Sequence, residues 1–399
     1  MRKILFVINT LGRGGAENAL IQLLNKIDRE KYGIDLYVIL GQGELVKKIP
    51  ENVVLLNEGY DDSSVLSAEG KSRMKKNILR SVFRKGSIFK NIFYLISIFF
   101  EMLGRKKILA DKLLWKVLSD ASDRFDTEYD LAVAFIEGAS AYYVHDHVKA
   151  AKKVAFFHTD YERAGYSRKI DRCVYKDFDR IFCVSDEVRK KFEKVYPECE
   201  GMTDTFENII DKESILKKGE ENIPFDEDFD GIKILTLGRL TEPKAIEISI
   251  EACSVLVNRG ENVRWYVLGE GDLRKKLEEQ IAGLNLEKIF LLPGAVDNPY
   301  PYLKKCDIYV QASRYEGKSV ALREAQAFEK PMVVSDIDSN LEQVTDMEDA
   351  LVSALDPEKL ADKIGMLIHD EDLGKRIAMN AGKRFSDGTD DLNKLLNMA

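Results

Sequence analysis

The sequence predicts an α/β fold made of two units, each built on a parallel sheet. Three observations predict it. Residues 3–27 have the order strand, glycine-rich turn and helix, with which a βαβ unit opens. Apolar, β-branched runs then alternate with stretches that can form helices, as in a parallel sheet covered on both faces. The same order begins again at residue 232, and 399 residues are enough for two such units.

Short apolar runs give the expected elements in order. The first unit opens with a strand at 3–9 and a helix at 16–27, and its further strands are expected at 35–40, 52–57, 130–136, 153–158 and 180–185. In the second unit we expect strands at 232–240, 263–269, 289–294, 308–313 and 331–336, and helices at 245–258, 272–283, 319–329 and 370–384. The expected domains are therefore 1–205 and 206–384, with a tail, 385–399, that crosses back to the first domain.

Composition narrows the class of protein. A hydrophobic content of 45% with 32% charged residues is typical of a soluble globular chain, and a net charge of −8 argues against a nucleic-acid partner. The five cysteines are scattered without a CxxC pair, so we expect reduced thiols in a cytoplasmic protein. The longest apolar run, residues 92–100, is too short to span a bilayer.

Glycines, cations and carboxylates stand where the predicted strands end. Ligands of open parallel sheets bind at the carboxyl ends of the strands, so these residues are the candidate binding groups. They are Gly12–Gly15, His158, Ser185, Gly238–Lys244, Gly269–Gly271, Gly294 and Tyr315–Ser319. Such a mixture suits a ligand that carries phosphates and many hydroxyl groups.

Two cations, Arg239 and Lys244, lie on one strand-to-helix turn with the sequence GRLTEPK. This arrangement is suited to a diphosphate, because the helix dipole and the free amide groups add to the charge of the side chains. A solvated loop with incidental charges is the alternative.

The segment YEGKSVALREAQAF carries a second candidate anion site. Ser319 can begin the helix and leave its own amide and that of Val320 free, while Lys318 adds charge beside them. Glu316 and Glu324 would repel a phosphate, so we expect them to accept hydrogen bonds from the hydroxyl pairs of a sugar or a ribose. Glutamates that simply face solvent are the alternative.

Three other patterns are weak. The turn GRGGAEN at 12–18 lacks the GxGxxG spacing, and Asp35 begins its predicted strand, which counts against a dinucleotide site. His145 and His147 lie in a predicted helix without further ligands nearby, so no metal site is expected. Four DxD spacings occur, and we attribute them to chance in an Asp-rich chain.

Taken together, GGAE, HTDY, GRLTEPK, LGEGDLRKKLE and the E-x7-E spacing within SRYEGKSVALREAQAFEKPMVVSD resemble the family 4 glycosyltransferases. The resemblance implies the GT-B fold, which has two facing Rossmann-like domains and a cleft between them. It implies a retaining enzyme without a cofactor, whose donor is a nucleotide sugar, with UDP the expected nucleotide. We also expect the donor site to be metal-independent, because fixed cations and helix amides can stabilise the departing diphosphate. The resemblance also implies a glycan acceptor, expected to be lipid-linked, in capsular or exopolysaccharide synthesis.

The resemblance assigns roles in the C-terminal domain. Arg239 and Lys244 resemble the pair that holds the donor diphosphate, and the backbone of Lys318, Ser319 and Val320 resembles the cap on its distal phosphate. Glu324 resembles the carboxylate that takes the ribose hydroxyls, and Glu316 the one beside the transferred sugar.

Two roles fall in the N-terminal domain. Gly15 would approach the distal phosphate, and His158 would face the donor sugar or the acceptor. Glu316 and His158 are therefore the candidate catalytic residues.

The chain departs from the family's pattern in three places. Ala245 stands where the family usually has a glycine, the loop after 341–346 is shortened around 347–355, and residues 385–392, apart from Phe385, lack the aromatic residues common in the closing helix. One alternative is therefore a non-catalytic partner subunit that binds a nucleotide sugar. A GT-B epimerase or phosphorylase, and a dinucleotide-dependent oxidoreductase, are the others.

Residues 71–107 are a local exception in charge. They contain eleven Lys or Arg and one acidic residue, Glu101, in a chain whose net charge is −8. The apolar residues gather in 88–103, a length suited to lying in the headgroup boundary of a bilayer. We expect this segment to dock on an anionic membrane at the inner face of the cell membrane; a buried helix with a solvated basic flank is the alternative.

Overall fold

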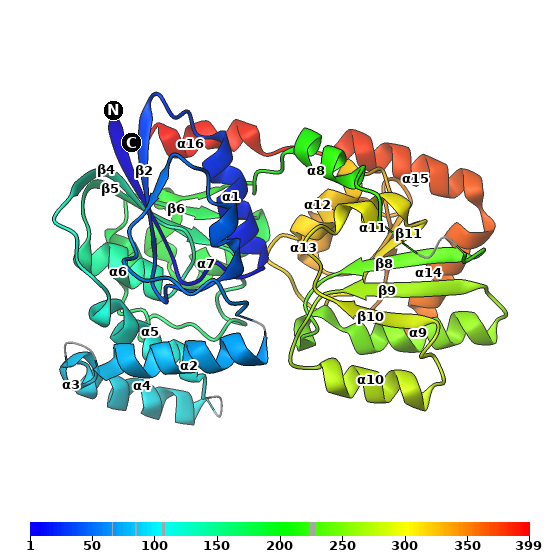
Figure 1. The fold of residues 1–399 in the computed structure, drawn as a ribbon, viewed down its shortest axis with the longest axis horizontal. Helices are drawn as coiled ribbons and strands as arrows, with labels where there is room; N and C mark the ends of the chain where they lie inside the picture. The colour runs from blue at the N-terminus through cyan, green and yellow to red at the C-terminus, as the bar shows by residue number, and fades with distance from the viewer. Residues whose placement is uncertain (66, 84–85, 106–107, 224, 226–227) are drawn as a thin grey trace. The chain divides into compact units, whose positions relative to one another are not determined.

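The structure is a computed structural model, and it describes residues 1–399 except 66, 84–85, 106–107, 224 and 226–227. The chain divides into two compact units (Figure 1). The first unit is Met1–Ile209 together with Gly388–Ala399, and the second is Ile210–Asp387. Each unit is an α/β structure with a wholly parallel sheet, so the predicted fold class is confirmed.

The sheet of the first unit has seven strands in the order β3-β2-β1-β4-β5-β6-β7. Asp35 lies inside its strand rather than at the start, and its carboxylate accepts a hydrogen bond from the Tyr129 hydroxyl at 2.7 Å. The strands are β1 Arg2–Ile8, β2 Tyr32–Val38, β3 Val53–Leu55, β4 Glu128–Ala134, β5 Lys149–Phe157, β6 Arg180–Cys183 and β7 Thr203–Thr205.

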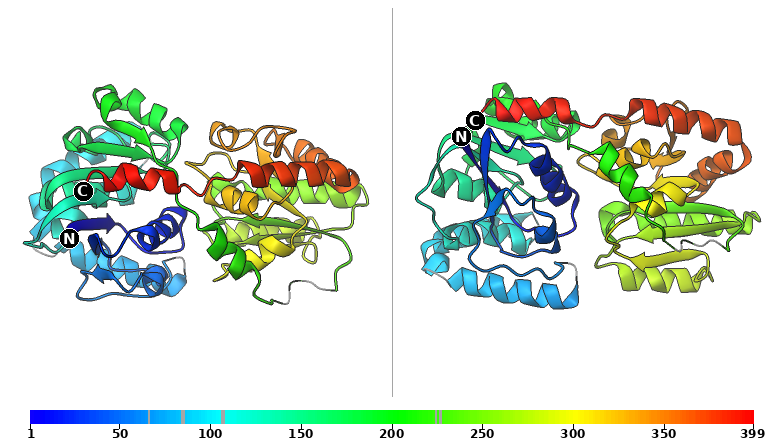
Figure 2. Two further views of the ribbon diagram at one scale, coloured as in Figure 1. Left: turned by 90° about the horizontal axis from the view of Figure 1, so that it is seen from above. Right: turned by 45° about the horizontal axis from the view of Figure 1, so that its top comes forward.

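Helices cover this sheet, and the end of the chain supplies one of them. The helices are α1 Gly15–Lys26, α2 Ala68–Phe83, α3 Ser87–Lys90, α4 Ile92–Gly104, α5 Ala110–Ala121, α6 Ala139–His147, α7 Asp186–Val195 and α16 Leu392–Leu396. Leu395 and Leu396 of α16 pack into the core of the first unit, and Arg2 donates a hydrogen bond to the Ala399 carbonyl at 2.7 Å. Figure 2 accordingly shows both termini on this unit.

The sheet of the second unit has six strands in the order β10-β9-β8-β11-β12-β13. Its strands are β8 Ile232–Leu237, β9 Val263–Leu268, β10 Phe290–Gly294, β11 Ile308–Gln311, β12 Met332–Ser335 and β13 Leu351–Ser353. Its helices are α8 Lys212–Gly219, α9 Ile246–Asn258, α10 Arg274–Gly283, α11 Tyr300–Lys305, α12 Val320–Ala327, α13 Asp338–Leu341, α14 Pro357–His369 and α15 Glu371–Arg384. The segment 347–355, which the sequence suggests is a shortened loop, thus contains strand β13.

Both faces of this sheet are buried. Ile234 and Leu235 are neighbours on β8, yet they belong to two different hydrophobic clusters, because successive side chains of a strand point to opposite faces. This explains the continuously apolar runs of the sequence. Polar groups that could bind a ligand are therefore found where the strands end.

Among the helices that the structure describes, none has both the length and the apolar character of a membrane span.

Candidate functional site

The turn predicted to hold a diphosphate follows β8 and is joined to the loop after β9. The N–H of Gly238 donates to the Leu268 carbonyl at 3.1 Å, and the N–H of Leu240 donates to the Glu270 carbonyl at 3.0 Å. A Cβ at residue 269 would lie 1.9 Å from the carbonyl oxygen of Gly238, so only a glycine permits this approach. Arg239 is exposed on the turn between these contacts.

Lys244 ends this turn, and its ammonium binds the carboxylate of Glu316. The hydroxyl of Ser313 donates to the same carboxylate oxygen at 2.6 Å. Both charged side chains are largely buried, with exposed fractions of 18% for Lys244 and 14% for Glu316. The structure thus brings together the cation predicted for the donor phosphate and the carboxylate predicted for the sugar.

Arg314, just past the end of β11, fixes the turn that carries Lys244. Its backbone N–H donates to the Pro243 carbonyl at 2.7 Å, and its guanidinium donates to the Glu242 carbonyl at 2.8 Å and pairs with Glu247. Reasoning from the sequence missed this residue, because its contacts lie 67–72 residues away. The available signal is its position directly after a predicted strand.

The N-terminus of α12 forms the second predicted anion site. Ser319 caps the helix: its hydroxyl oxygen accepts a hydrogen bond from the Leu322 amide at 3.2 Å and its O–H donates to Gln311 at 2.7 Å. The helix begins at Val320, so its first amides have no carbonyl acceptor within the helix. Lys318 precedes the cap and is half-buried.

Glu324 lies on the second turn of α12 and is partly buried. The Tyr300 hydroxyl donates to its carboxylate at 2.9 Å, and the Tyr300 ring stacks on Phe328 with 6.0 Å between the ring centroids. Burial raises the pKa of Glu324 to about 7, although the hydrogen bond from Tyr300 works in the opposite direction. Near neutral pH this carboxyl group is therefore divided between its charged and uncharged forms.

The two glutamates act on one buried group, the hydroxyl of Tyr309 on β11. Burial raises the pKa of Tyr309, and the charges of Glu324 and Glu316 raise it further. Both carboxylates therefore lie within electrostatic range of the same side chain. Tyr309 in turn donates a hydrogen bond to the Gln311 side chain at 3.1 Å. Gln311 also accepts the hydrogen bond of Ser319, so it connects Tyr309 to the residue that caps α12.

His158, in the first unit, directly follows β5. Its ring packs on Phe135 and Phe156, with centroid distances of 5.1 and 6.2 Å. Burial lowers the pKa of His158, against the charge of Glu137 and a hydrogen bond to the Phe135 backbone, so its surroundings favour the neutral imidazole. Its Nε2 is buried and has no hydrogen-bond partner among the described residues.

Glu137, which reasoning from the sequence missed, holds the loop that carries His158. Its buried carboxylate accepts hydrogen bonds from the His158 amide at 3.1 Å and from the Thr159 hydroxyl. A carboxylate directly after the apolar run 130–136 is the signal that could have found it. Gly15, at the start of α1, is exposed, and a Cβ there would meet no described atom within 4 Å. Its approach to the donor phosphate stays a prediction.

Residues 219–384 match the family described as "Glycosyl transferases group 1". The chain is 26% identical, over 97% of its length and 94% of the other protein, to the Campylobacter jejuni GalNAc-alpha-(1->4)-GalNAc-alpha-(1->3)-diNAcBac-PP-undecaprenol alpha-1,4-N-acetyl-D-galactosaminyltransferase. It is 37% identical over 129 residues, 32% of the chain and 33% of the other protein, to the N-acetylgalactosamine-N,N'-diacetylbacillosaminyl-diphospho-undecaprenol 4-alpha-N-acetylgalactosaminyltransferase of that organism. The chain spans only part of three of its relatives, the second Campylobacter protein among them: the matched region covers 33–54% of their own length.

The structure of Anabaena Alr3699/HepE in complex with UDP-glucose superimposes with a TM-score of 0.69 at 18% identity, covering 100% of each chain. The chain therefore has the GT-B fold, and its residues 219–384 match a family of glycosyltransferases. The family match contains Arg239, Lys244, Glu316 and Glu324, whereas Gly15 and His158 lie outside it. The predicted family is thereby confirmed, and the role of each residue stays a prediction.

Ala245 stands where the sequence resemblance leads us to expect a glycine, and its backbone conformation is one that glycine adopts most easily. Its backbone is left-handed, with φ 48° and ψ 39°, and its side chain is buried. An L-residue other than glycine pays about 1–2 kcal/mol for this conformation. The alanine adopts this strained conformation and the turn is kept, including the contact between Lys244 and Glu316.

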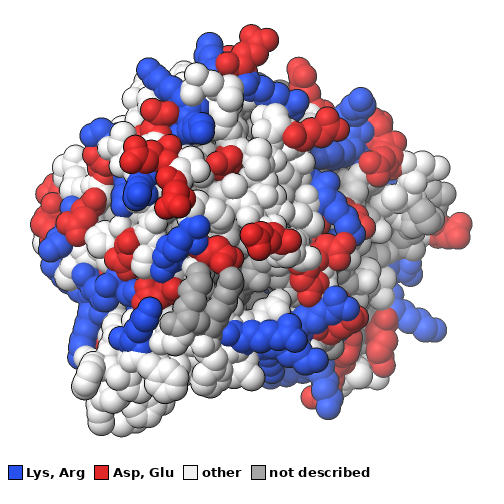
Figure 3. Space-filling view, turned by 60° about the vertical axis from the view of Figure 1, so that its left-hand side comes forward, with Lys and Arg blue, Asp and Glu red and all other residues white. Residues whose placement is uncertain are grey.

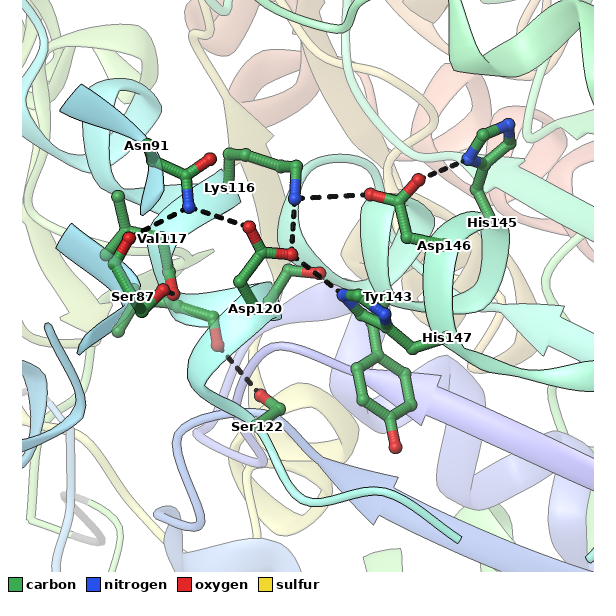
Figure 4. Close-up of polar contacts among 12 residues, drawn as sticks. Ser87, Asn91, Lys116, Val117, Asp120, Ser122, Tyr143, His145, Asp146 and His147 are labelled. Carbon is green, nitrogen blue, oxygen red and sulfur yellow. Dashed lines mark hydrogen bonds and ion pairs between the residues drawn. The ribbon is translucent and has the colours of Figure 1, made fainter. Parts of the chain in front are cut away.

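Among the described residues of the first unit, one group is of metal-ligand type. Asp120, Asp146 and His147 offer ligand atoms that all lie within 4.8 Å of one another. The ammonium of Lys116 binds Asp120 and lies 3.3 Å from Asp146, so it stands between the two carboxylates (Figure 4). Because a side-chain cation already neutralises the cluster, we assign no metal to it.

Proposed function

We propose that this glycosyltransferase moves a sugar from a UDP-sugar to a lipid-linked glycan, with retention of anomeric configuration, in the assembly of a surface polysaccharide. The observation that carries the proposal is the contact between Lys244 and Glu316, four residues before the N-terminus of α12. Two similar proteins support the donor and the acceptor. HepE was crystallised with UDP-glucose, and the name of the Campylobacter protein that matches over 97% of this chain includes an undecaprenol-linked glycan as the molecule it acts on.

The leaving diphosphate would be held by positive groups of the second unit. Breaking the bond between the sugar and the phosphate builds negative charge on the diphosphate and positive charge on the sugar. Arg239, Lys244 and the first amides of α12 stabilise the diphosphate without a metal ion. Glu316 shares Lys244 with the phosphate and stabilises the positive charge on the sugar.

Glu324 would hold the ribose of the nucleotide. Its carboxyl group accepts the hydrogen bond of Tyr300 in the structure, and a carboxylate can accept from two vicinal hydroxyls at once. We therefore expect the ribose diol to share or replace the Tyr300 contact. The E-x7-E spacing then serves both ends of one donor, with the sugar at Glu316 and the ribose at Glu324.

Retention follows if the acceptor attacks from the face that the phosphate leaves. The bond from the anomeric carbon to the phosphate oxygen breaks, the bond to the acceptor oxygen forms, and the acceptor proton passes to the departing phosphate oxygen. No protein nucleophile is needed in this scheme. His158 would accept a hydrogen bond from a sugar hydroxyl through its unpartnered Nε2, and the open surface at Gly15 would admit a phosphate.

A thermal-shift screen tests the donor. Binding at a hundredfold excess over the dissociation constant raises stability by roughly 2.7 kcal/mol. We expect UDP-sugars to raise the melting temperature and NAD and NADP to leave it unchanged. Stabilisation by NAD, with none by any UDP-, GDP- or ADP-sugar, would contradict the proposal.

Product analysis with a supplied glycan acceptor distinguishes the proposed activity from the alternative functions. Transfer to the acceptor is expected. A changed nucleotide sugar without transfer would indicate an epimerase, a sugar phosphate formed from inorganic phosphate would indicate a phosphorylase, and donor binding without hydrolysis or transfer would indicate a non-catalytic subunit.

A further inference from the structure

A row of large apolar side chains lies exposed on α3 and α4. Phe93, Ile96, Phe100 and Leu103 follow one another on α4 at spacings of three and four residues, which places them along one face of that helix, and Phe89 precedes them on α3. Phe93 is 84% exposed and Phe100 is 64% exposed. We call these five residues the apolar row. Large apolar side chains gathered on one exposed face indicate an interaction surface.

The opposite face of α4 is packed onto the first unit. Ile98 and Met102 are buried against Ile170, and the Tyr94 hydroxyl donates to the Ile170 carbonyl at 2.8 Å. The inner face of α4 is therefore packed against the first unit. The exposure of the apolar row is a property of the folded unit and does not come from a helix that has lost its partner.

Buried polar contacts fix the start of α4 to the unit (Figure 4). The amide group of Asn91 donates to Asp120 at 2.7 Å and to the Ser87 carbonyl at 3.0 Å. Asp120 also binds Lys116 and His147. Although burial works in the opposite direction, the hydrogen bonds from His147, Lys116 and Asn91 lower the pKa of Asp120, so the anchor stays charged across the physiological range.

Positive charge borders the apolar row. Lys90 and Arg105 stand at its two ends, and α2, which packs on α5 as α4 does, carries the exposed Lys75, Lys76 and Arg80. Figure 3 shows uncharged side chains gathered at the lower corner of this face and Lys and Arg side chains beside them. This border supplies the sign of charge that an anionic surface would attract.

Negative charge is scarce in the same segment. Glu101 is the single acidic residue of 71–107. Its carboxylate lies 3.2 Å from the Arg105 guanidinium and accepts a hydrogen bond from the Ser167 hydroxyl at 2.6 Å, so Glu101 offsets the charge of Arg105.

We propose that the apolar row inserts into the headgroup boundary of an anionic bilayer while Lys75, Lys76, Arg80 and Lys90 contact lipid phosphates. With 13 residues, α4 is about 20 Å long, so it can lie in the interface and cannot span the roughly 30 Å hydrocarbon layer. A second copy of the chain would bring like charges together around the row, which disfavours a dimer here. The inference deepens the proposed function and rests on it for the reason to meet a membrane, which is a lipid-linked acceptor.

Vesicle flotation tests the two components separately. The vesicles contain either phosphatidylcholine alone or phosphatidylcholine with phosphatidylglycerol, over a series of salt concentrations. We expect the parent to bind the anionic vesicles at low salt and to release them as salt rises, because salt screens surface charge. Phe93→Ser with Phe100→Ser should weaken binding about tenfold per side chain at every salt concentration.

The charge variant has a matched control. Lys75→Glu with Lys76→Glu should weaken binding about thirtyfold or more, because each basic residue near an anionic leaflet contributes about fivefold. The control is Lys275→Glu with Lys276→Glu, an equal change of net charge on an exposed helix of the second unit, α10. The control should bind like the parent, which would exclude an effect of net charge alone.

Three outcomes would overturn the inference. They are no binding of the parent to anionic vesicles at low salt, equal binding by the parent and the Phe variant, and equal losses in the charge variant and its control. If the Phe variant abolishes a dimer in sedimentation and leaves vesicle binding intact, the row is an interface between copies. Vesicle binding needs no donor, so transfer to a water-soluble glycan, measured in parallel, reports on the proposed function independently.

Discussion

The ammonium of Lys244 and the carboxylate of Glu316 are bound to each other, although 72 residues separate them in the chain. One comes from the turn after β8 and the other from the loop after β11, and these two strands are neighbours in the sheet. The pair therefore joins the two segments that the sequence singles out. It also means that a donor phosphate must share Lys244 with Glu316.

Substitutions of the pair should have opposite consequences for the nucleotide. Lys244→Ala should weaken UDP binding about ten- to hundredfold, because a charge-assisted hydrogen bond contributes about 1.5–3 kcal/mol. Glu316→Gln leaves Lys244 to the phosphate, so UDP affinity should be kept or increased while turnover falls. Titration calorimetry with UDP and a turnover assay measure both. A large loss of UDP affinity in Glu316→Gln would contradict the assignment of this residue to the sugar.

Glu324→Gln should weaken binding of free UDP by about the same ten- to hundredfold, because the ribose loses a charged acceptor. The same calorimetric titration measures this. Glu279→Gln, which changes an exposed glutamate on α10, is the matched control and should bind UDP like the parent. If Glu324→Gln binds UDP as tightly as the parent, the ribose assignment is wrong.

The same substitution makes a prediction about stability and pH. Glu324 has a folded-state pKa of about 7, above the ordinary value of 4.5, so its contribution to stability is complete below about pH 4.5 and is lost as pH rises through 7. Glutamine does not ionise and escapes that loss. Unfolding by urea should therefore find Glu324→Gln more stable than the parent at pH 8, by on the order of 1–3 kcal/mol, and less so at pH 5. A difference that does not change with pH would show that Glu324 is not perturbed by burial.

Ala245→Gly should remove the strain of the left-handed backbone at this position. The release of about 1–2 kcal/mol is offset in part by the greater freedom of glycine in the unfolded chain, so a net gain of about 0.5–1 kcal/mol is expected. Urea denaturation measures it, with Ala252→Gly inside α9 as a control that should lose stability. A loss of stability in Ala245→Gly would mean that the alanine methyl contributes more packing energy than the strain costs.

The contrast between the predicted and missed features has a physical cause. The strands β8, β9 and β11 and the helix α12 could be located from the sequence, because a strand buried on both faces is an uninterrupted apolar run. The strand β7 could not, since its three residues, Thr203–Thr205, have no apolar side chain. Arg314 and Glu137 were missed because each acts through partners that are distant in the chain or identifiable only once the loops are folded.

Turnover should continue in excess EDTA. Arg239, Lys244 and the amides of α12 already supply positive potential where the diphosphate is expected, so the leaving group would need no divalent cation. The assay measures release of UDP from the donor in the presence of acceptor, with and without the chelator. Complete loss of activity that magnesium or manganese restores would contradict the proposed donor site.

The stereochemistry of the product tests the central claim most directly. An α-linked UDP-sugar is supplied with a lipid-linked or water-soluble glycan acceptor, and proton NMR follows the anomeric signals of the first product formed. We predict that UDP is released only with the acceptor present and that the transferred sugar is α-linked. A β-linked first product, or UDP release without any transfer, would contradict a retaining glycosyltransferase.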